Sequence, residues 1–317
     1  MKKYLEDLRQ ELMKQKLTEK EIEEIIADHK EMISNAIDEG LSEEEIKAKF
    51  GKPSQVAEEL ADSDDQEPAE QEETKGFQLL ESFEVKGDSI SVDVNLIYED
   101  ITYQLGEDSQ IKVFYQGKGK VEKYEVSYEK NEFRLSAPKR HGFNFFINKE
   151  DGINFLVELP RKVIVNVLKQ VIISSDSVFK NLNIKQFIAN STSGDLDIDH
   201  CQVEKFKLHS VSGDSKIENS TFEDMVLSLV SGDVFIKNTT ITQDFKASTV
   251  SGDVHVTDVT CVNFEMSAVS GDVNGKEFYP QKVIFKSVSG DLNIKNKEKK
   301  YIEIVKNSTL SGDINIS

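Results

Sequence analysis

The sequence of 317 residues contains no tryptophan, two cysteines and five prolines, and it has no long apolar run. A membrane-spanning helix needs about 18 or more consecutive apolar residues, so no segment is predicted to span a bilayer. The first residues, MKKYLEDLRQ, place acids where a signal peptide has its apolar stretch. These absences predict a cytoplasmic protein, with association at the membrane surface or the cell surface left open.

Basic residues are also few, because 39 lysines and arginines face 58 aspartates and glutamates, which gives a net charge of −19. Residues 1–75 carry −12 of that charge. Proteins that bind nucleic acid normally present a basic stripe to the phosphates, so we expect no nucleic-acid partner. The cysteines form no CxxC motif and no histidine pair has metal-ligand spacing, so we expect no metal and no cofactor.

Residues 1–61 predict a small all-α domain. Two capping boxes, Thr18 with Glu21 and Ser42 with Glu45, precede apolar residues at three- and four-residue spacing. The opening helix is expected to bury one face, formed by Tyr4, Leu5, Leu8, Leu12 and Met13. Short amphipathic helices of this kind must pack on one another or on a partner.

This first segment resembles the small helical signalling domain called HAAS, which bacteria frequently encode beside PadR-type regulators. The resemblance rests on LTEKEIEEIIADHKEMI and GLSEEEIKAKFGKPSQVAEEL, in that order. It implies a role in signalling or docking.

The chain changes character after the helical domain. Residues 62–76 are acidic and lack large apolar side chains, which predicts a solvated flexible linker. From Phe77 the apolar residues alternate with period two in short runs, so residues 77–159 predict a lead-in rich in β-strands.

Residues 160–317 contain the tripeptide Ser-Gly-Asp on a nearly constant period of 19 residues, with single steps of 20 and 22. A degenerate copy, ISSDSVF, precedes the seven clean ones. The repeated glycines are Gly194, Gly213, Gly232, Gly252, Gly271, Gly290 and Gly312.

Such a short unit cannot bury a core by itself, whereas stacked copies align their apolar residues into columns. We therefore predict a mainly β protein, a parallel β-solenoid of about 19-residue coils with Ser-Gly-Asp at a corner. Glycine permits the corner backbone, and the serine and aspartate oxygens are expected to accept hydrogen bonds from backbone N–H groups there. Cys201 and Cys261 fall three coils apart, too far for a disulfide, and Asp258 is placed outside the repeat columns.

Three apolar columns are expected in the interior. The first lies immediately before the serine, the second three residues after the aspartate, and the third later in each repeat. The first contains Ile173, Val211, Val230, Val250, Val269, Val288 and Leu310. The second contains Phe179, Ile198, Ile217, Ile236, Val256, Ile294 and Ile316. The third contains Phe187, Phe206, Phe245, Phe264 and Ile284.

Residues 77–317 resemble the putative-adhesin family of bacterial β-strand-repeat domains. SISVDVNLI, the later VELP and the serial SVSGD and TVSGD motifs carry this resemblance. It implies a setting at the bacterial cell envelope, since Gram-positive relatives are associated with envelope stress.

Candidate contact residues lie where the repeat is interrupted or ends. The segment KRHGFNFFINKEDG combines basic and aromatic residues, and it is either a hairpin that covers the end of the solenoid or an exposed tip that touches a membrane or a protein. Its candidate contacts are Lys139, Arg140, Phe143, Phe145 and Phe146. In the last coil, Ile314 and Ile316 are candidates for pairing with an earlier segment or another chain, which would give weak self-association.

The repeat places the same side chains on every coil, whereas catalysis needs different groups that converge once, so we expect no catalytic residues. The sequence favours a non-enzymatic interaction scaffold with protein partners, linked to envelope signalling or stress. The alternatives are a surface adhesin exported by a route that the sequence does not reveal and, less favoured, a solenoid hydrolase or lyase acting on polysaccharides.

Overall fold

The computed structural model describes residues 2–14, 76–138 and 152–317, with single residues at 22, 26, 30, 33, 53 and 54. The chain divides into two compact units, Met1–Thr74 and Lys75–Ser317.

In the first unit, helix α1 (Lys2–Leu12) buries Tyr4, Leu8 and Leu12. Met13 was expected on the same buried face, but 56% of its surface is exposed, so that prediction was wrong. The predicted capping boxes lie outside the described residues. Among the described residues, no helix is long and apolar enough to cross a membrane.

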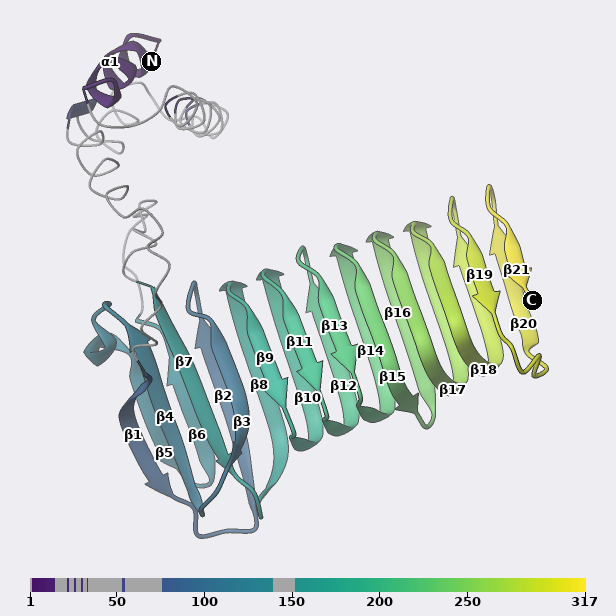
Figure 1. Ribbon diagram of the computed structural model, residues 1–317, viewed down its shortest axis with the longest axis horizontal. Coiled ribbons are helices and arrows are strands. Elements are labelled where there is room, and N and C mark those ends of the chain that lie inside the picture. The colour runs from purple at the N-terminus through teal and green to yellow at the C-terminus, as the bar shows by residue number, and fades with distance from the viewer. Residues whose placement is uncertain are drawn as a thin grey trace. The chain divides into compact units, whose positions relative to one another are not determined.

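The second unit is a parallel β-solenoid of about eight coils, which confirms the predicted fold class (Figure 1). Each coil joins one strand to a second, usually shorter strand through the Ser-Gly-Asp corner. The first strands of the coils are β8 (Ile164–Ser174), β10 (Asn183–Ser193), β12 (Gln202–Ser210), β14 (Thr221–Ser231), β16 (Asp244–Ser251) and β20 (Glu303–Thr309). The second strands are β9 (Ser177–Lys180), β11 (Leu196–Asp199), β13 (Ser215–Glu218), β15 (Val234–Ile241), β19 (Leu292–Lys295) and β21 (Ile314–Ile316). Strands β17 (Val254–Ser270) and β18 (Val273–Ser287) each run through the other corner and so serve two coils.

The coils stack in register, so equivalent residues of successive repeats lie side by side. Phe187 pairs with Phe206, and Ile198 pairs with Ile217. The column three residues after the aspartate is buried as predicted as far as Ile294, and Ile316 is partly buried. In the third predicted column the phenylalanine rings pack on one another, with centroids 5.0 Å apart for Phe187 and Phe206.

One assignment in the third column is wrong. Val283, not Ile284, aligns with Phe264 and is fully buried. Ile284 lies on the outward side of strand β18 because neighbouring residues of a strand face opposite ways.

The start of the solenoid does not follow chain order. Strand β2 (Ser89–Leu96) pairs in parallel with β8 on one side and with β6 (Glu132–Ser136) on the other. Strand β3 (Ile101–Gly106) likewise lies between β9 and β7 (Ile153–Pro160). The coil made by β2 and β3 is therefore enclosed by a later segment of the chain. The stack thus continues into the segment predicted as a lead-in.

Antiparallel strands cover the N-terminal end of the stack. Strand β4 (Gln110–Gly117) pairs with β7 and with β1 (Gln78–Glu84), while β5 (Glu125–Glu129) pairs with β6. A short 3₁₀ helix, η1 (Val121–Lys123), precedes β5. Covering an edge strand in this way satisfies backbone groups that would otherwise pair with another chain.

Candidate functional site

The Ser-Gly-Asp corners stack so closely that their glycines have no room for a side chain. A Cβ built on Gly213 would lie 2.2 Å from the carbonyl oxygen of Gly194, and one on Gly252 would lie 2.3 Å from that of Gly232. Gly194, Gly213 and Gly232 also have φ angles of +100 to +112°. The same close approach, 2.0 to 2.3 Å to the preceding corner, recurs at Gly271, Gly290 and Gly312, and Gly194 itself faces Ser175.

The aspartates of the corners form a continuous hydrogen-bonded ladder. Oδ1 of Asp195 accepts a hydrogen bond of 2.8 Å from the backbone N–H of Asp214, and Oδ1 of Asp214 accepts one of 2.8 Å from Asp233. The ladder runs through every coil to Asp313 and begins at Asp100, which the repeat pattern had not revealed. A hydrogen bond to a charged acceptor contributes about 1.5–3 kcal/mol, which exceeds the repulsion of about 1 kcal/mol between neighbouring carboxylates in water. No cation is needed to hold this column.

The serines of the corners donate hydrogen bonds, whereas they were predicted to accept them. The Oγ of Ser212 donates to the carbonyl of Thr192 at 3.2 Å, and that of Ser231 donates to the carbonyl of Val211 at 3.1 Å. The aspartates, and not these serines, therefore accept from the corner N–H groups.

The opposite corner of each coil is built on a residue with positive φ. These residues are Asn181, His200, Asn219, Asn238, Asp258 and Glu277, with φ between 50 and 60°. Asp258 therefore belongs to a repeat column, and its placement outside the columns was wrong. Asparagine and aspartate tolerate this conformation better than most residues because their short polar side chains can hydrogen-bond locally.

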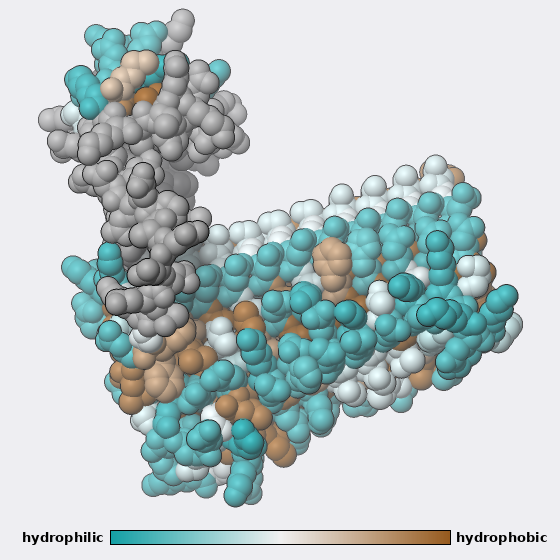
Figure 2. Space-filling view, in the orientation of Figure 1, coloured by the Kyte–Doolittle hydropathy of each residue, from teal (hydrophilic) through white to brown (hydrophobic). Residues whose placement is uncertain are grey.

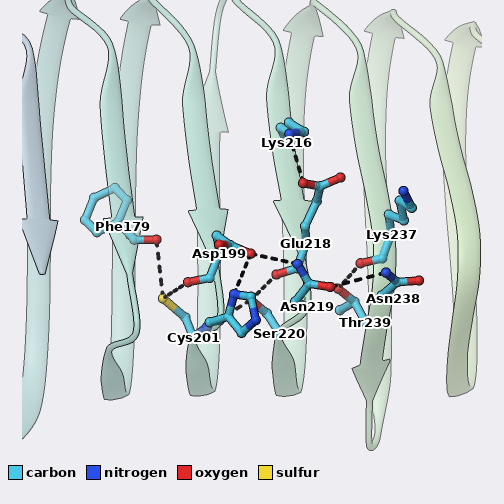
Figure 3. Close-up of polar contacts among 11 residues, drawn as sticks. Phe179, Asp199, Cys201, Lys216, Glu218, Asn219, Ser220, Lys237, Asn238 and Thr239 are labelled. Atoms are coloured by element: carbon cyan, nitrogen blue, oxygen red, sulfur yellow. Dashed lines mark hydrogen bonds and ion pairs between the residues drawn. The ribbon is translucent and has the colours of Figure 1, made fainter. Parts of the chain in front are cut away.

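Polar side chains connect successive coils along this second corner (Figure 3). Nδ2 of Asn219 donates to Oδ1 of Asp199 at 2.9 Å, and Nδ2 of Asn238 donates to Oδ1 of Asn219 at 3.2 Å. The hydrogen bond from Asn219 lowers the pKa of Asp199 below its usual value. The hydroxyl of Ser220 donates to the carbonyl of Glu218 within the same turn. These hydrogen bonds join neighbouring coils, so this corner contributes to the stability of the stack.

The apolar column immediately before the serine is not in the core, so its predicted burial was wrong. Val211, Val230, Val250, Val269 and Val288 are 47–51% exposed, and Ile173 is 45% exposed. The residue before each of these side chains faces inward instead, as Ser210 and Leu229 do, and both are buried. Leu310 continues this exposed line in the last coil, and Thr192 occupies the same position in one coil. We call these aligned side chains the valine row.

A groove of about 460 Å³ runs beside the valine row across five coils, from β8 to β16. One wall is the valine row, and the other is a mostly polar column that begins at Val171. The polar wall contains Asn190, His209, Ser228 and Ser248. The floor contains Ile172, Ser191, Ser210, Leu229 and Thr249. Thr249 is only 6% exposed, and its Oγ1 has no hydrogen-bond partner among the described residues. The groove therefore has one apolar wall and one polar wall.

Two family models match this chain. The Toastrack DUF4097 model matches residues 88–274 and 242–317, which together span more than half of the chain. The chain belongs to the Toastrack DUF4097 family. The match begins one residue before β2, at the first coil of the stack. Residues 3–59 match the HAAS model, so the N-terminal segment is similar to that domain.

Solved structures resemble the Toastrack region in fold. One is described as a "putative lipid binding protein" from Parabacteroides distasonis. It has 15% sequence identity and a TM-score of 0.50, and the match covers 75% of this chain and 96% of that one. Another, a "putative adhesin" from Parabacteroides merdae, has 12% identity and a TM-score of 0.37, with coverage of 77% and 98%. None of the curated protein sequences matches this chain.

The remaining predicted contact residues of the Toastrack region fall in two places. Lys139, Arg140, Phe143, Phe145 and Phe146 lie outside the described residues. Ile314 and Ile316 lie in β21, where they are partly buried and pair with Leu292 and Ile294 of β19.

Reactive groups do not gather in the described part of the Toastrack region. No group of three histidine, cysteine, aspartate or glutamate side chains there could hold a metal ion. Cys201 and Cys261 are free and buried, and burial raises the pKa of their thiols to about 11 and about 12. Figure 2 shows a largely hydrophilic face of the solenoid. The imidazole of His255 stacks on the ring of Phe235, with the ring centroids 4.9 Å apart. This pair of rings stabilises adjacent strands.

Proposed function

We propose that the protein is a non-enzymatic interaction scaffold at the bacterial cell envelope. Its Toastrack solenoid would present the groove and valine row to a binding partner, and its HAAS-like segment would connect that binding to signalling. The observation that carries the proposal is the valine row, because exposed contiguous apolar surface on a protein marks an interaction site.

The repeated construction of the solenoid supports binding rather than catalysis. The aspartate ladder repeats one side chain on every coil, and Oδ1 of Asp195 and of Asp214 each accept a hydrogen bond from a backbone N–H. A groove of this size lies within the range of about 300–1,000 Å³ that ligand pockets span. The match of residues 3–59 to the HAAS model supports a signalling context.

The test uses the full chain as bait in quantitative capture from its native host. Wild type is compared with Val211→Asp/Val230→Asp/Val250→Asp and with a control triple variant, Phe77→Asp/Leu79→Asp/Val305→Asp. The control residues are also 40–55% exposed but lie outside the groove. We expect envelope-associated proteins to be retained by wild type and control and lost from the groove variant. Equal retention by all three proteins would contradict the proposal, as would polysaccharide cleavage that the groove variant abolishes.

The relative described as a lipid-binding protein suggests a first small ligand to examine. A fluorescent long-chain fatty acid is titrated into wild type and the same two variants. Saturable binding that only the groove variant loses would make the groove a site for an acyl chain.

A further inference from the structure

We propose that the groove and the valine row bind a second copy of this chain. In this dimer each copy places its valine row in the groove of the other, with the two solenoids side by side and parallel. The inference rests on the proposed function and names the partner of the same surface.

The spacing of the side chains favours another solenoid as the occupant. Both walls of the groove repeat once per coil, because they are columns of one stack of parallel strands about 4.8 Å apart. An extended strand repeats side chains on one face about every 6.7 Å, and an α-helix advances about 5.4 Å per turn. Either would fall out of step with the groove within a few coils. A second stack of the same coils stays in step along the whole row.

The row and the groove are also adjacent on the same surface, which suits a twofold dimer. In such an interface the same patch is used by both copies, so a ridge beside a matching groove is self-complementary. Val230 of one copy would then lie between Ser228 and Val230 of the other, over the floor formed by Leu229 and Thr249. The half-exposed valines would lose their remaining contact with water.

The charges around the row select the parallel arrangement. The aspartate ladder lies on the far side of the valine row from the groove, three residues along the chain from each valine. With the twofold axis along the solenoid, each ladder faces the column of Asn190, His209 and Ser228 on the other copy, which contains no acidic side chain. With antiparallel solenoids the two ladders would face each other, and like charges across an interface are unfavourable.

Sedimentation velocity over a concentration series tests whether the dimer forms. Wild type is compared with Val211→Thr/Val230→Thr/Val250→Thr, with the corresponding triple aspartate variant, and with the control variant described above. Threonine is a mild change, because Thr192 already occupies this row in one coil. We expect concentration-dependent dimerisation of wild type and control. The threonine variant should dissociate more readily, and the aspartate variant should raise the dissociation constant at least about 100-fold.

Cross-linking tests the orientation. Val211→Cys and Val269→Cys are made separately in the full chain, where Cys201 and Cys261 stay buried. In the parallel dimer each variant alone forms a disulfide-linked dimer on oxidation, because equal coils face each other. Cross-links that appear only when the two variants are mixed would overturn the parallel arrangement.

The outcomes separate this inference from the proposed function. A wild type that remains monomeric at all concentrations would overturn the dimer, and so would equal dimerisation of the aspartate variant. If that monomer still loses captured proteins or a fatty acid when the row is mutated, the scaffold function stands and the groove belongs to another ligand.

Discussion

The phenol of Tyr103 donates a hydrogen bond of 2.8 Å to Oε1 of Gln170 inside the core. Nε2 of the same glutamine donates to Oγ of Ser177 at 2.7 Å. The ring of Tyr103 stacks on Phe179 at 4.6 Å. This network joins β3 to β8 and β9, where residues 101–106 meet a segment much later in the chain. Burial raises the pKa of Tyr103 well above its usual value, so the phenol stays protonated and donates.

Replacing Tyr103 by phenylalanine should destabilise the solenoid. The change leaves the buried oxygen of Gln170 without its donor, which costs about 1–3 kcal/mol. Denaturant unfolding of the full chain measures the loss. The control is Tyr115→Phe, which removes an exposed hydrogen bond to Gln78 and should change stability by less than about 0.5 kcal/mol. Equal effects would show that the buried network contributes nothing particular.

Gly252→Ala should be far more damaging than Gly76→Ala. The new methyl group at Gly252 would lie 2.3 Å from the carbonyl of Gly232, whereas at Gly76 no atom lies within 4 Å. We expect a loss of about 1–3 kcal/mol or more at the corner, because the stacked backbone must shift. Gly76→Ala should be nearly neutral. Thermal unfolding compares them, and similar midpoints would mean that the corner has room to relax.

At the second corner, a glycine should reduce stability less than a β-branched residue does. Asn238 has a φ of 50°, so Asn238→Val should cost about 1–2 kcal/mol for the left-handed backbone, besides the bond to Asn219. Asn238→Gly removes the same side chain without that backbone cost and should be milder. Because both variants lose the hydrogen bond, the difference between their unfolding free energies isolates the conformation. A difference near zero would show that the left-handed backbone at this position costs no stability.

Both thiols should be unreactive in the native protein. Burial raises the pKa of Cys201 to about 11 and of Cys261 to about 12, so neither forms a thiolate at pH 8. Alkylation without reductant, read by intact mass, should label no cysteine in buffer and two in denaturant. Labelling of fewer than two in denaturant would indicate a disulfide.

These thiols also make stability depend on alkaline pH. The folded pKa values lie above the value of 9.0 for an unperturbed thiol. Their contribution is therefore complete below about pH 9 and decreases as the pH rises toward about 11 to 12. Denaturant unfolding of wild type, Cys201→Ser and Cys261→Ala between pH 7 and 10 measures it. A slope shared by all three proteins would assign the effect to other groups.

The solenoid could be predicted from sequence because its period is repeated in the chain. The repeated glycine, aspartate and aromatic residues each identify a column without any knowledge of the structure. The predicted burial of the valines is wrong because apolar character alone does not distinguish a core position from a half-exposed one. Counting in steps of two from the buried Phe206 places Leu208 and Ser210 inside and Val211 outside, so alternation alone would have exposed the row.

The coil of β2 and β3 carried too weak a signal. It has no Ser-Gly-Asp, and Glu99 lies where later coils have serine or glycine. Its buried carboxylate instead accepts hydrogen bonds from the N–H groups of Ile97 and Tyr98. In the sequence of this coil, only Asp100 matches the repeated aspartate that forms the ladder. The groove was also missed, because its walls are neighbouring columns whose concavity depends on how the strand bends into the corner.

The enclosed coil gives the protein an order of assembly. Asp100 accepts its hydrogen bond from Asp176, which lies 76 residues later, so the first coil cannot be completed when it leaves the ribosome. Its strands stay unpaired until β6 and β7 are synthesised for one side and β8 and β9 for the other. Contacts between distant residues slow folding because the chain must close a long loop first. Each later coil closes over about 19 residues and can be added in sequence during synthesis. We therefore expect the folding of nascent chains to pause at this junction.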